Sequence, residues 1–242
     1  MSLRFKELEL LKERYAKEDY YTRDPELGFT FLIRGASLQN LSFCSKVVAE
    51  HPDLLGETDC IGNNALHSAV MGGSNLELIQ FFLDKGERPI YRESGGNTLS
   101  SFFSVSRKIE KITPEHIQVV NRMLDLFPPK IFQDGETKKH ILREILMGIC
   151  REPAFIPCIQ KVLGKVENPV LELERLRRFS GLVTHPGRKF KKGSYPTREE
   201  FQVALRKLRE ELKKTGDKIE EDDLPLSLFE SPLEKPSSCL EL

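Results

Sequence analysis

The chain of 242 residues has no tryptophan, only five cysteines and no excess of charge of either sign. Its 37 basic and 37 acidic side chains cancel, so no overall field draws it toward nucleic acid or a membrane surface. The cysteines are odd in number and include no Cys-x-x-Cys motif, which argues against a disulfide framework and a structural zinc site. Scattered thiols suit a reducing compartment, so we expect a cytoplasmic location.

Long apolar runs and catalytic signatures are also missing. No stretch approaches the roughly 18 apolar residues of a membrane-spanning helix. Four of the six residues at 4–9 are charged, where a signal peptide would have its apolar stretch. The sequence contains no Gly-rich phosphate loop, no His-Glu-x-x-His and no Gly-x-Ser-x-Gly. We therefore expect a soluble protein that is not an enzyme, without catalytic, cofactor-binding or metal-binding residues and without a nucleic-acid partner.

What the sequence does contain is an internal repeat with a period of about 33 residues. Each copy places a glycine, a small polar residue and a leucine at alternate positions. The copies are Gly28-Thr30-Leu32, Gly62-Asn64-Leu66 and Gly95-Asn97-Leu99. Self-similarity at this period is typical of stacked helix pairs rather than one closed core. We expect an all-α solenoid in which the three leucines lie at equivalent depths.

The second copy carries a family resemblance. Its Asn64-Ala65-Leu66-His67 resembles the Thr-Pro-Leu-His turn of ankyrin repeats, and an apolar stripe follows it as far as Gly86. Asn64 is expected to cap the inner helix, and Gly86 to end the outer one. The resemblance implies about four ankyrin-like units, a function in specific protein binding, and a hydrogen-bonding role for the ring of His67 within and between repeats.

This interpretation divides the chain into four parts. They are an N-terminal capping helix (1–23), repeats at 24–57, 58–91, 92–133 and 134–165, a helical extension with a basic loop (166–216), and an acidic flexible tail (217–242).

Helices are expected at 3–20, 140–150, 154–163, 169–179 and 198–214 as well as within the first three repeats. The first has an apolar stripe of Phe5, Leu8, Leu11 and Tyr15. In the third repeat, Thr113-Pro114-Glu115 is expected to start the outer helix, after roughly nine extra residues around 105–112. Such an insertion fits a binding edge or neutral drift in a tolerant loop.

Partners of ankyrin-like arrays usually meet a concave face of turn tips and inner helices, as the resemblance implies. By position the tips hold Glu57, Arg88, Tyr91, Arg92 and Glu93, and the inner helices hold Ser68, Met71 and Ser101. Tyr91 and the arginines are the expected anchors, because aromatic and arginine side chains often dominate interfaces. The partner is expected to be a protein.

The last third of the chain suggests two further contacts. Residues 175–192 carry seven basic side chains and no acid, and Arg188, Lys189, Lys191 and Lys192 form a candidate anion-binding patch. The patch fits an anionic surface or a solvated loop that pairs with the acidic tail. The tail resembles the export signals of ankyrin effectors secreted by the type IV system of intracellular bacteria, which would bring the protein into a host cell. Cys239 matches a prenylation box poorly, because Glu241 stands where an aliphatic residue is required.

Two alternatives remain open at the level of sequence. One is an enzyme in which a histidine converges with Cys150 or Cys158 between the repeats and the C-terminal helices. The other is an adaptor of eukaryotic type in the cytosol or nucleus. The candidate histidines are His51, His67, His116, His140 and His185.

Overall fold

The computed structural model describes residues 3–17, 19–73, 75–90, 97–106, 112–127, 131, 145, 155–165, 203, 206, 207 and 210. The chain forms two units, Met1–Ile131 and Phe132–Leu242. Every regular element in the described part is helical, and none of these residues lies in a strand. The all-α expectation is confirmed there. Among the same residues, no helix combines the length and apolar composition that a bilayer crossing requires.

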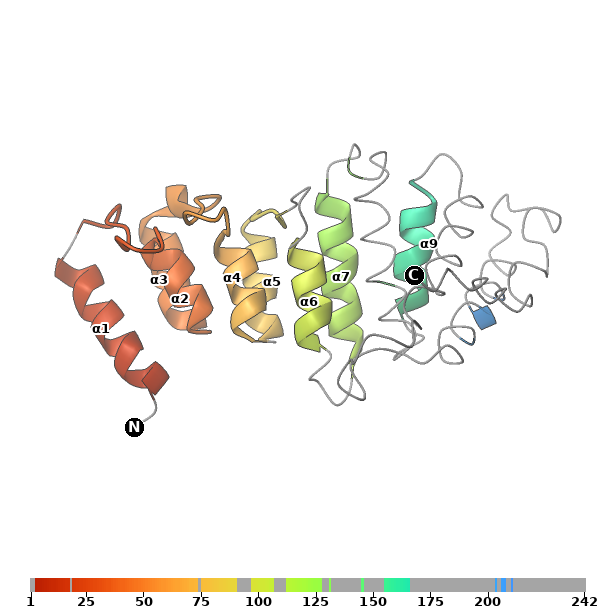
Figure 1. The fold of residues 1–242 in the computed structure, drawn as a ribbon, viewed down its shortest axis with the longest axis horizontal. Helices are drawn as coiled ribbons and strands as arrows, with labels where there is room; N and C mark the ends of the chain where they lie inside the picture. Colours follow the sequence, from red (N-terminus) through yellow and green to blue (C-terminus); the bar gives the residue numbers. More distant parts are fainter. Residues whose placement is uncertain are drawn as a thin grey trace, which may run out of the picture. The chain divides into compact units, whose positions relative to one another are not determined.

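The first unit contains seven α-helices and one short 3-10 helix in its described part (Figure 1). In chain order they are α1 (Leu3–Lys17), α2 (Phe31–Ser37), α3 (Leu41–Glu50), η1 (Pro52–Leu54), α4 (Ala65–Gly72), α5 (Leu76–Asp84), α6 (Thr98–Ser106) and α7 (Pro114–Leu126).

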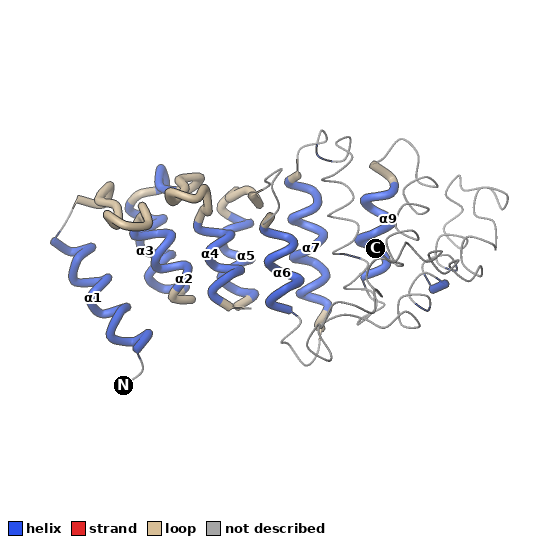
Figure 2. The backbone as a smooth tube through the Cα atoms, viewed as in Figure 1, coloured by secondary structure: helices blue, strands red, loops and turns tan. Residues whose placement is uncertain are grey.

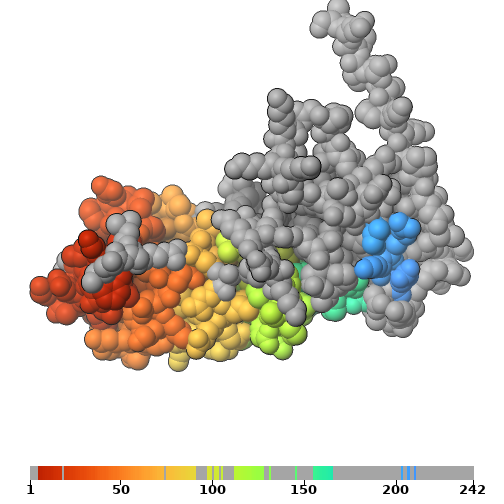
Figure 3. Space-filling view, turned by 90° about the horizontal axis from the view of Figure 1, so that it is seen from below, coloured from red at the N-terminus to blue at the C-terminus, as the bar shows by residue number. Residues whose placement is uncertain are grey.

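The helices of this unit form two rows. In the inner row α2 packs on α4 and α4 on α6, and in the outer row α3 packs on α5 and α5 on α7. The rows are tied together within pairs by α2 with α3 and α4 with α5, and α6 meets α7 where the rings of Phe102 and His116 lie 6.2 Å apart. Figure 3, seen from the helix ends opposite the loops, shows the surface continuing from α1 (red) to α7 (green).

Three leucines occupy the same position in the inner row. Leu32, Leu66 and Leu99 are each the second residue of their helix, and each is 0% exposed. The expectation of equivalent depths is confirmed. The inner helices are short and nearly enclosed, because each contacts a neighbour in its own row and a partner in the outer row. Close packing also explains Gly35, where an added Cβ would lie 2.6 Å from Cδ1 of Phe43.

Local signals mark the helix ends. The side chains of Thr30 and Asn64 accept hydrogen bonds from the first turns of α2 and α4, at 3.2 and 2.9 Å. Gly86 follows α5 with φ +84°, and Glu87 N–H donates to the carbonyl of Phe82 at 3.0 Å. This is the left-handed Schellman ending, which favours glycine. The predicted cap at Asn64 and the predicted stop at Gly86 are both confirmed.

The start of α7 follows Thr113, whose backbone N–H donates to Nδ1 of His116 at 3.1 Å. Pro114 occupies the first turn, where its missing N–H costs no helical hydrogen bond. The predicted start is confirmed. The insertion in the third repeat is shorter than expected. The start of α5 follows the start of α4 by eleven residues, whereas the start of α7 follows the start of α6 by sixteen. The excess is five residues rather than about nine.

The first helix differs from its expectation in two ways. It ends at Lys17 rather than near residue 20. Of the predicted stripe, Leu11 is buried and Tyr15 packs edge-on to Phe31 and Phe43, whereas Phe5 is 47% exposed. Helix α1 packs against α2, and its residues that do not meet α2 remain exposed.

In the second unit the structure describes α9 (Ile156–Leu163) and isolated residues. The helix expected at 154–163 is thus present with a start two residues later, and its apolar face, including Cys158, is buried. Ile145 is helical, and so are the four exposed residues Val203, Arg206, Lys207 and Glu210. The remaining residues of the helices predicted at 140–150, 169–179 and 198–214 lie outside the described part.

Candidate protein-binding surface

Two loops of the first unit join into one edge over the ends of the helix pairs. Residues 19–29 precede α2 and residues 52–63 precede α4, and both lie above the helices in Figure 2, drawn in tan except for η1. The backbone N–H of Cys60 donates to the carbonyl of Leu27 at 3.1 Å, which connects the two loop tips. We refer to residues 19–29 and 52–63 as the loop edge.

Arg23 fixes the two loops against each other. Its guanidinium donates to the carbonyl of Gly28 at 3.2 Å and to that of Thr58 at 2.7 Å. It also pairs with the carboxylate of Glu57. Arg23 therefore has partners on both loops. Because these bonds satisfy backbone carbonyls, they stabilise the shape of the edge.

Each loop tip is built by the same turn chemistry. The carboxylate of Asp24 accepts the backbone N–H of Leu27 at 2.8 Å, and that of Asp59 accepts the N–H of Ile61 at 3.0 Å. A glycine with positive φ follows each tip, +67° at Gly28 and +78° at Gly62. Side chains bonded to their own backbone in this way are typical of tight turns.

The apolar side chains at the tips face outward. Leu27 and Ile61 each stand directly before the left-handed glycine, and they are 47% and 64% exposed. Tyr21, on the same edge, is 56% exposed and donates its hydroxyl proton to Asp53 at 2.6 Å. Large exposed apolar groups gathered on one edge mark interaction sites more strongly than scattered ones do.

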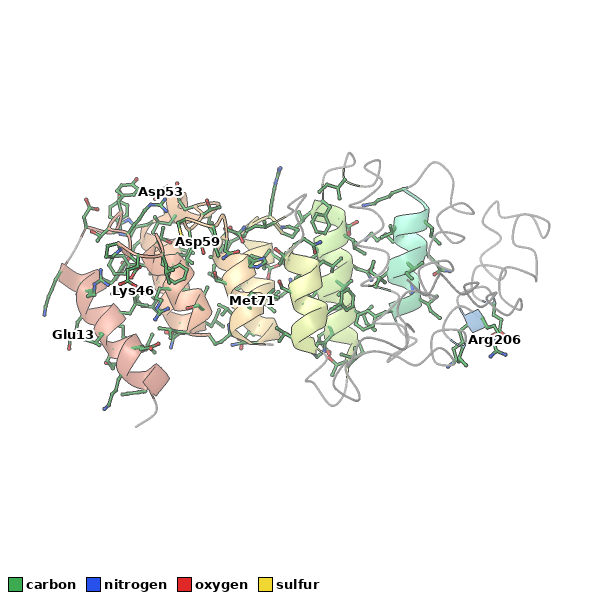
Figure 4. The ribbon with its side chains drawn as sticks, in the orientation of Figure 1. Glu13, Lys46, Asp53, Asp59, Met71 and Arg206 are labelled. Atoms are coloured by element: carbon green, nitrogen blue, oxygen red, sulfur yellow. The ribbon has the colours of Figure 1, made fainter. Side chains whose placement is uncertain are left out.

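The loop edge is also acidic. It contains Asp19, Asp24, Glu26, Asp53, Glu57 and Asp59 against a single base, Arg23. Figure 4 labels Asp53 and Asp59 on this side of the helix pairs. Six acids and one base give a formal charge of −5 on a chain whose total is zero. The overall neutrality therefore hides a local concentration of negative charge.

A buried polar group supports the edge from beneath. Glu87 is 2% exposed, and its Oε2 accepts the backbone N–H of Gly56 at 3.0 Å. Burial raises the pKa of the Glu87 carboxyl to about 7. Asn64 completes the link, since its amide donates to the carbonyl of Arg88 at 2.8 Å. These bonds connect the loop before α4 to the segment after α5.

The residues that were expected to bind a partner differ in location and in exposure. Glu57 lies on the loop edge, half-buried and paired with Arg23. Arg88 is exposed, and Ser101 is half-buried on α6. Ser68 is only 7% exposed, because α4 is enclosed by neighbouring helices. The expectation that Ser68 offers its side chain to a partner therefore loses its structural basis.

Met71 is 58% exposed, near the C-terminal end of α4 and away from the loop edge, which precedes the N-terminal end (Figure 4). Tyr91, Arg92 and Glu93 lie outside the described residues. So do the four residues of the candidate anion patch, Arg188, Lys189, Lys191 and Lys192. Of the described members of the expected set, only Glu57 lies on the loop edge.

Sequence reasoning missed Tyr21, Leu27 and Ile61. A signal for two of them exists, since each stands as a large apolar residue directly before a turn glycine, where a polar residue is the usual choice. The sequence does not show whether such residues are buried, whereas the structure gives their exposed fractions.

Of the two cysteines named in the enzyme alternative, Cys150 lies outside the described residues and Cys158 is buried. Cys44 and Cys158 are both 0% exposed, and burial raises the pKa of each thiol to about 12. A thiol in that state is a poor nucleophile at neutral pH. Cys60 is exposed. Among the described residues, no group of three or more His, Cys, Asp or Glu side chains is arranged to hold a metal ion.

The three described histidines serve packing and hydrogen bonding. Nδ1 of His67 lies 3.2 Å from Oγ1 of Thr98, which links α4 to the start of α6. This is the hydrogen-bonding contact between repeats that was expected for His67. His51 stacks on Tyr20 with ring centroids 3.6 Å apart, and His116 bonds to Thr113 at the start of α7. Burial lowers the pKa of His116.

A separate cleft of about 250 Å³ lies between α1, α2 and the loop that joins them. Its lining includes Glu7 and Arg34, whose charged atoms lie 3.5 Å apart, and the Arg34 guanidinium lies 5.6 Å from the ring centre of Phe29. The lining thus contains charges of both signs, and it favours neither a cation nor an anion.

Comparison with known proteins gives no family assignment: no protein-family model matches the chain, and no curated protein shows a significant match to it.

Proposed function

We propose that the first unit is a protein-binding module built in the manner of an ankyrin-repeat array, without catalytic chemistry of its own. The supporting observation is the inner row, in which Leu32, Leu66 and Leu99 take the same helical position at the same depth. A row of similar pairs presents an extended surface, and such arrays commonly recognise other proteins. The local sequence at 64–67 and the contact of His67 with Thr98 fit the same proposal.

The test is capture of a stoichiometric partner. The tagged full chain is crosslinked in its native cellular setting, purified, and analysed by mass spectrometry and light scattering. We expect a complex of fixed stoichiometry whose partner is chemically unchanged. A Leu66→Asp variant serves as the control, because a charge in the buried inner row should abolish folding and capture together.

The proposal fails under two outcomes. One is that the folded chain captures no protein above the level of the Leu66→Asp control. The other is that the captured molecule is a substrate that the purified chain converts, which would favour the enzyme alternative.

The proposal that residues 217–242 act as an export signal depends on the sequence alone, because this segment lies outside the described residues. Its test is delivery of a chain that ends at residue 216. If the tail is the signal, delivery into host cells stops while the thermal unfolding of the purified protein is unchanged. Delivery of the shortened chain would rule out the tail as the signal.

A further inference from the structure

We infer that the loop edge binds a segment of a partner protein that is rich in both basic and apolar side chains, with Leu27 and Ile61 as its apolar contacts. This inference rests on the proposed binding function and identifies the chemistry of the partner. It follows from three properties of the edge, namely its exposed apolar groups, its charge and its rigidity.

The apolar contacts come from adjacent loops. The carbonyl of Leu27 accepts the N–H of Cys60, and Ile61 follows Cys60 in the chain. Both tips thus belong to one continuous surface, with Tyr21 further along it beside Asp53. A partner that covers Leu27 and Ile61 removes two large apolar side chains from water, which favours binding in proportion to the area covered.

The negative charge of the loop edge favours a partner segment of positive charge. The only base of the edge is Arg23, whose guanidinium is already bonded to Glu57 and to two backbone carbonyls. Glu26 is exposed, directly before Leu27. Charges within about 10 Å of each other act together at moderate salt, so a partner segment with lysines or arginines beside its apolar groups is attracted here. An acidic partner is repelled.

The edge is held in its shape before a partner arrives. The turn bonds of Asp24 and Asp59, the Arg23 bonds to both loops and the bond from Gly56 to Glu87 all fix the backbone. An ordered binding surface loses less conformational entropy on association, which strengthens binding for a given contact area.

The test uses the full chain and a fluorescent peptide with the sequence of residues 175–192 as a probe of the required chemistry. This peptide carries seven basic residues, no acid and several apolar residues, including Phe179 and Phe190. One control peptide replaces the basic residues by glutamine, and a second replaces the apolar residues by serine. We expect measurable binding by anisotropy, at least tenfold weaker binding of both controls, and weaker binding at higher salt.

Matched variants locate the site on the chain. Leu27→Ser combined with Ile61→Ser, and separately Glu26→Lys, should each weaken binding of the probe at least fivefold. The controls are Met71→Ser and Leu10→Ser, which change residues that are 58% and 61% exposed elsewhere, and Glu77→Lys on α5. These should stay within twofold of the parent chain. Circular-dichroism melts establish that all variants fold.

Several outcomes would overturn the inference. Binding that survives Leu27→Ser with Ile61→Ser, or that falls equally in the Met71→Ser control, places the peptide elsewhere. If sedimentation of the chain alone detects a dimer and the edge variant loses it, the edge is assigned to a second copy of the chain. A further variant changes the seven basic residues of 175–192 to glutamine in the full chain. If this variant binds the unchanged peptide tenfold more tightly than the parent chain, the edge is assigned to the chain's own segment 175–192.

Failure of the inference is distinct from failure of the binding function. If the edge variant captures the same crosslinked partner at the same stoichiometry as the parent chain, the module function stands and the edge is not its site. If neither chain captures a partner, the module function itself is wrong.

Discussion

Oε2 of Glu87 accepts the backbone N–H of Gly56 at 3.0 Å, which joins a carboxyl after α5 to the loop before α4. The Glu87 side chain is almost completely buried, and its second oxygen has no hydrogen-bond partner among the described residues. Removal from water disfavours the ionised form and outweighs the interactions with Gly56 and Asn64 that favour it, which is why the pKa rises from 4.5 to about 7.

Glu87 should make the stability of the protein depend on pH. Between about pH 4.5 and 7 the folded state keeps a proton that the unfolded state has released, so the free energy of unfolding falls as pH rises through this window. The shift corresponds to about 3 kcal/mol, present below pH 4.5 and lost above pH 7. Urea unfolding at pH 5.5 and pH 8 should show about 2 kcal/mol of this difference, because the part between pH 4.5 and 5.5 is already lost at the lower pH.

The variant for this prediction is Glu87→Gln, which removes the titration and retains a similar shape. We expect the difference in unfolding free energy between pH 5.5 and pH 8 to shrink relative to the parent chain. Glu26→Gln, at an exposed position, is the matched control and should leave the difference unchanged. Equal pH dependence in the parent chain and Glu87→Gln would show that Glu87 titrates normally.

Apart from the equal depth of the three inner-row leucines, which follows from the repeat, the features that the sequence predicted correctly have local causes. The cap at Asn64, the stop at Gly86 and the start at Thr113 each depend on bonds to backbone within a few residues. Burial depends on neighbours that spacing along one helix does not reveal. Ser68 is buried because α4 is enclosed by α2, α5 and α6, and Phe5 is exposed despite its place in the apolar stripe. Glu87 has no sequence signal, since its burial is set by loops about thirty residues upstream.

The contact between His67 and Thr98 should be measurable as a coupling between helix pairs. Nδ1 of His67 lies 3.2 Å from Oγ1 of Thr98, and both residues are buried. A double-mutant cycle of His67→Leu and Thr98→Val, measured by urea unfolding, should give a coupling energy of about 1 kcal/mol. Thr98→Ser keeps the hydroxyl and should retain most of the coupling. Additive effects of the two changes would mean that the bond contributes nothing to stability.

Substitutions at two glycines measure separately how much close contact and how much backbone conformation cost in unfolding free energy. An added Cβ at Gly72 would lie 2.5 Å from the carbonyl oxygen of Ser37, whereas at Gly86 nothing lies within 4 Å and only the positive φ opposes a side chain. Gly86→Ala should therefore cost about 1 kcal/mol of unfolding free energy. Gly72→Ala should cost more, about 2 to 3 kcal/mol, because α2 and α4 must move apart. Thermal or urea unfolding of both variants gives the comparison, and the reverse order would mean that the α2 and α4 ends separate freely.

The thiols should react with iodoacetamide in an order set by burial. Cys60 is exposed on the loop edge, while Cys44 and Cys158 are inaccessible and have pKa values raised to about 12. Since the thiolate is the reacting form, alkylation in the native protein at pH 7.5 should modify Cys60 at least a hundredfold faster than the other two. Peptide mass spectrometry follows each site separately, and Cys60→Ser is the control that removes the fast phase among these three thiols. In urea the three rates should converge, because unfolding removes the difference in accessibility. A Cys158 that reacts as fast as Cys60 in the folded chain would have to be both accessible and ionised. That result would contradict its burial and restore the case for a catalytic thiol.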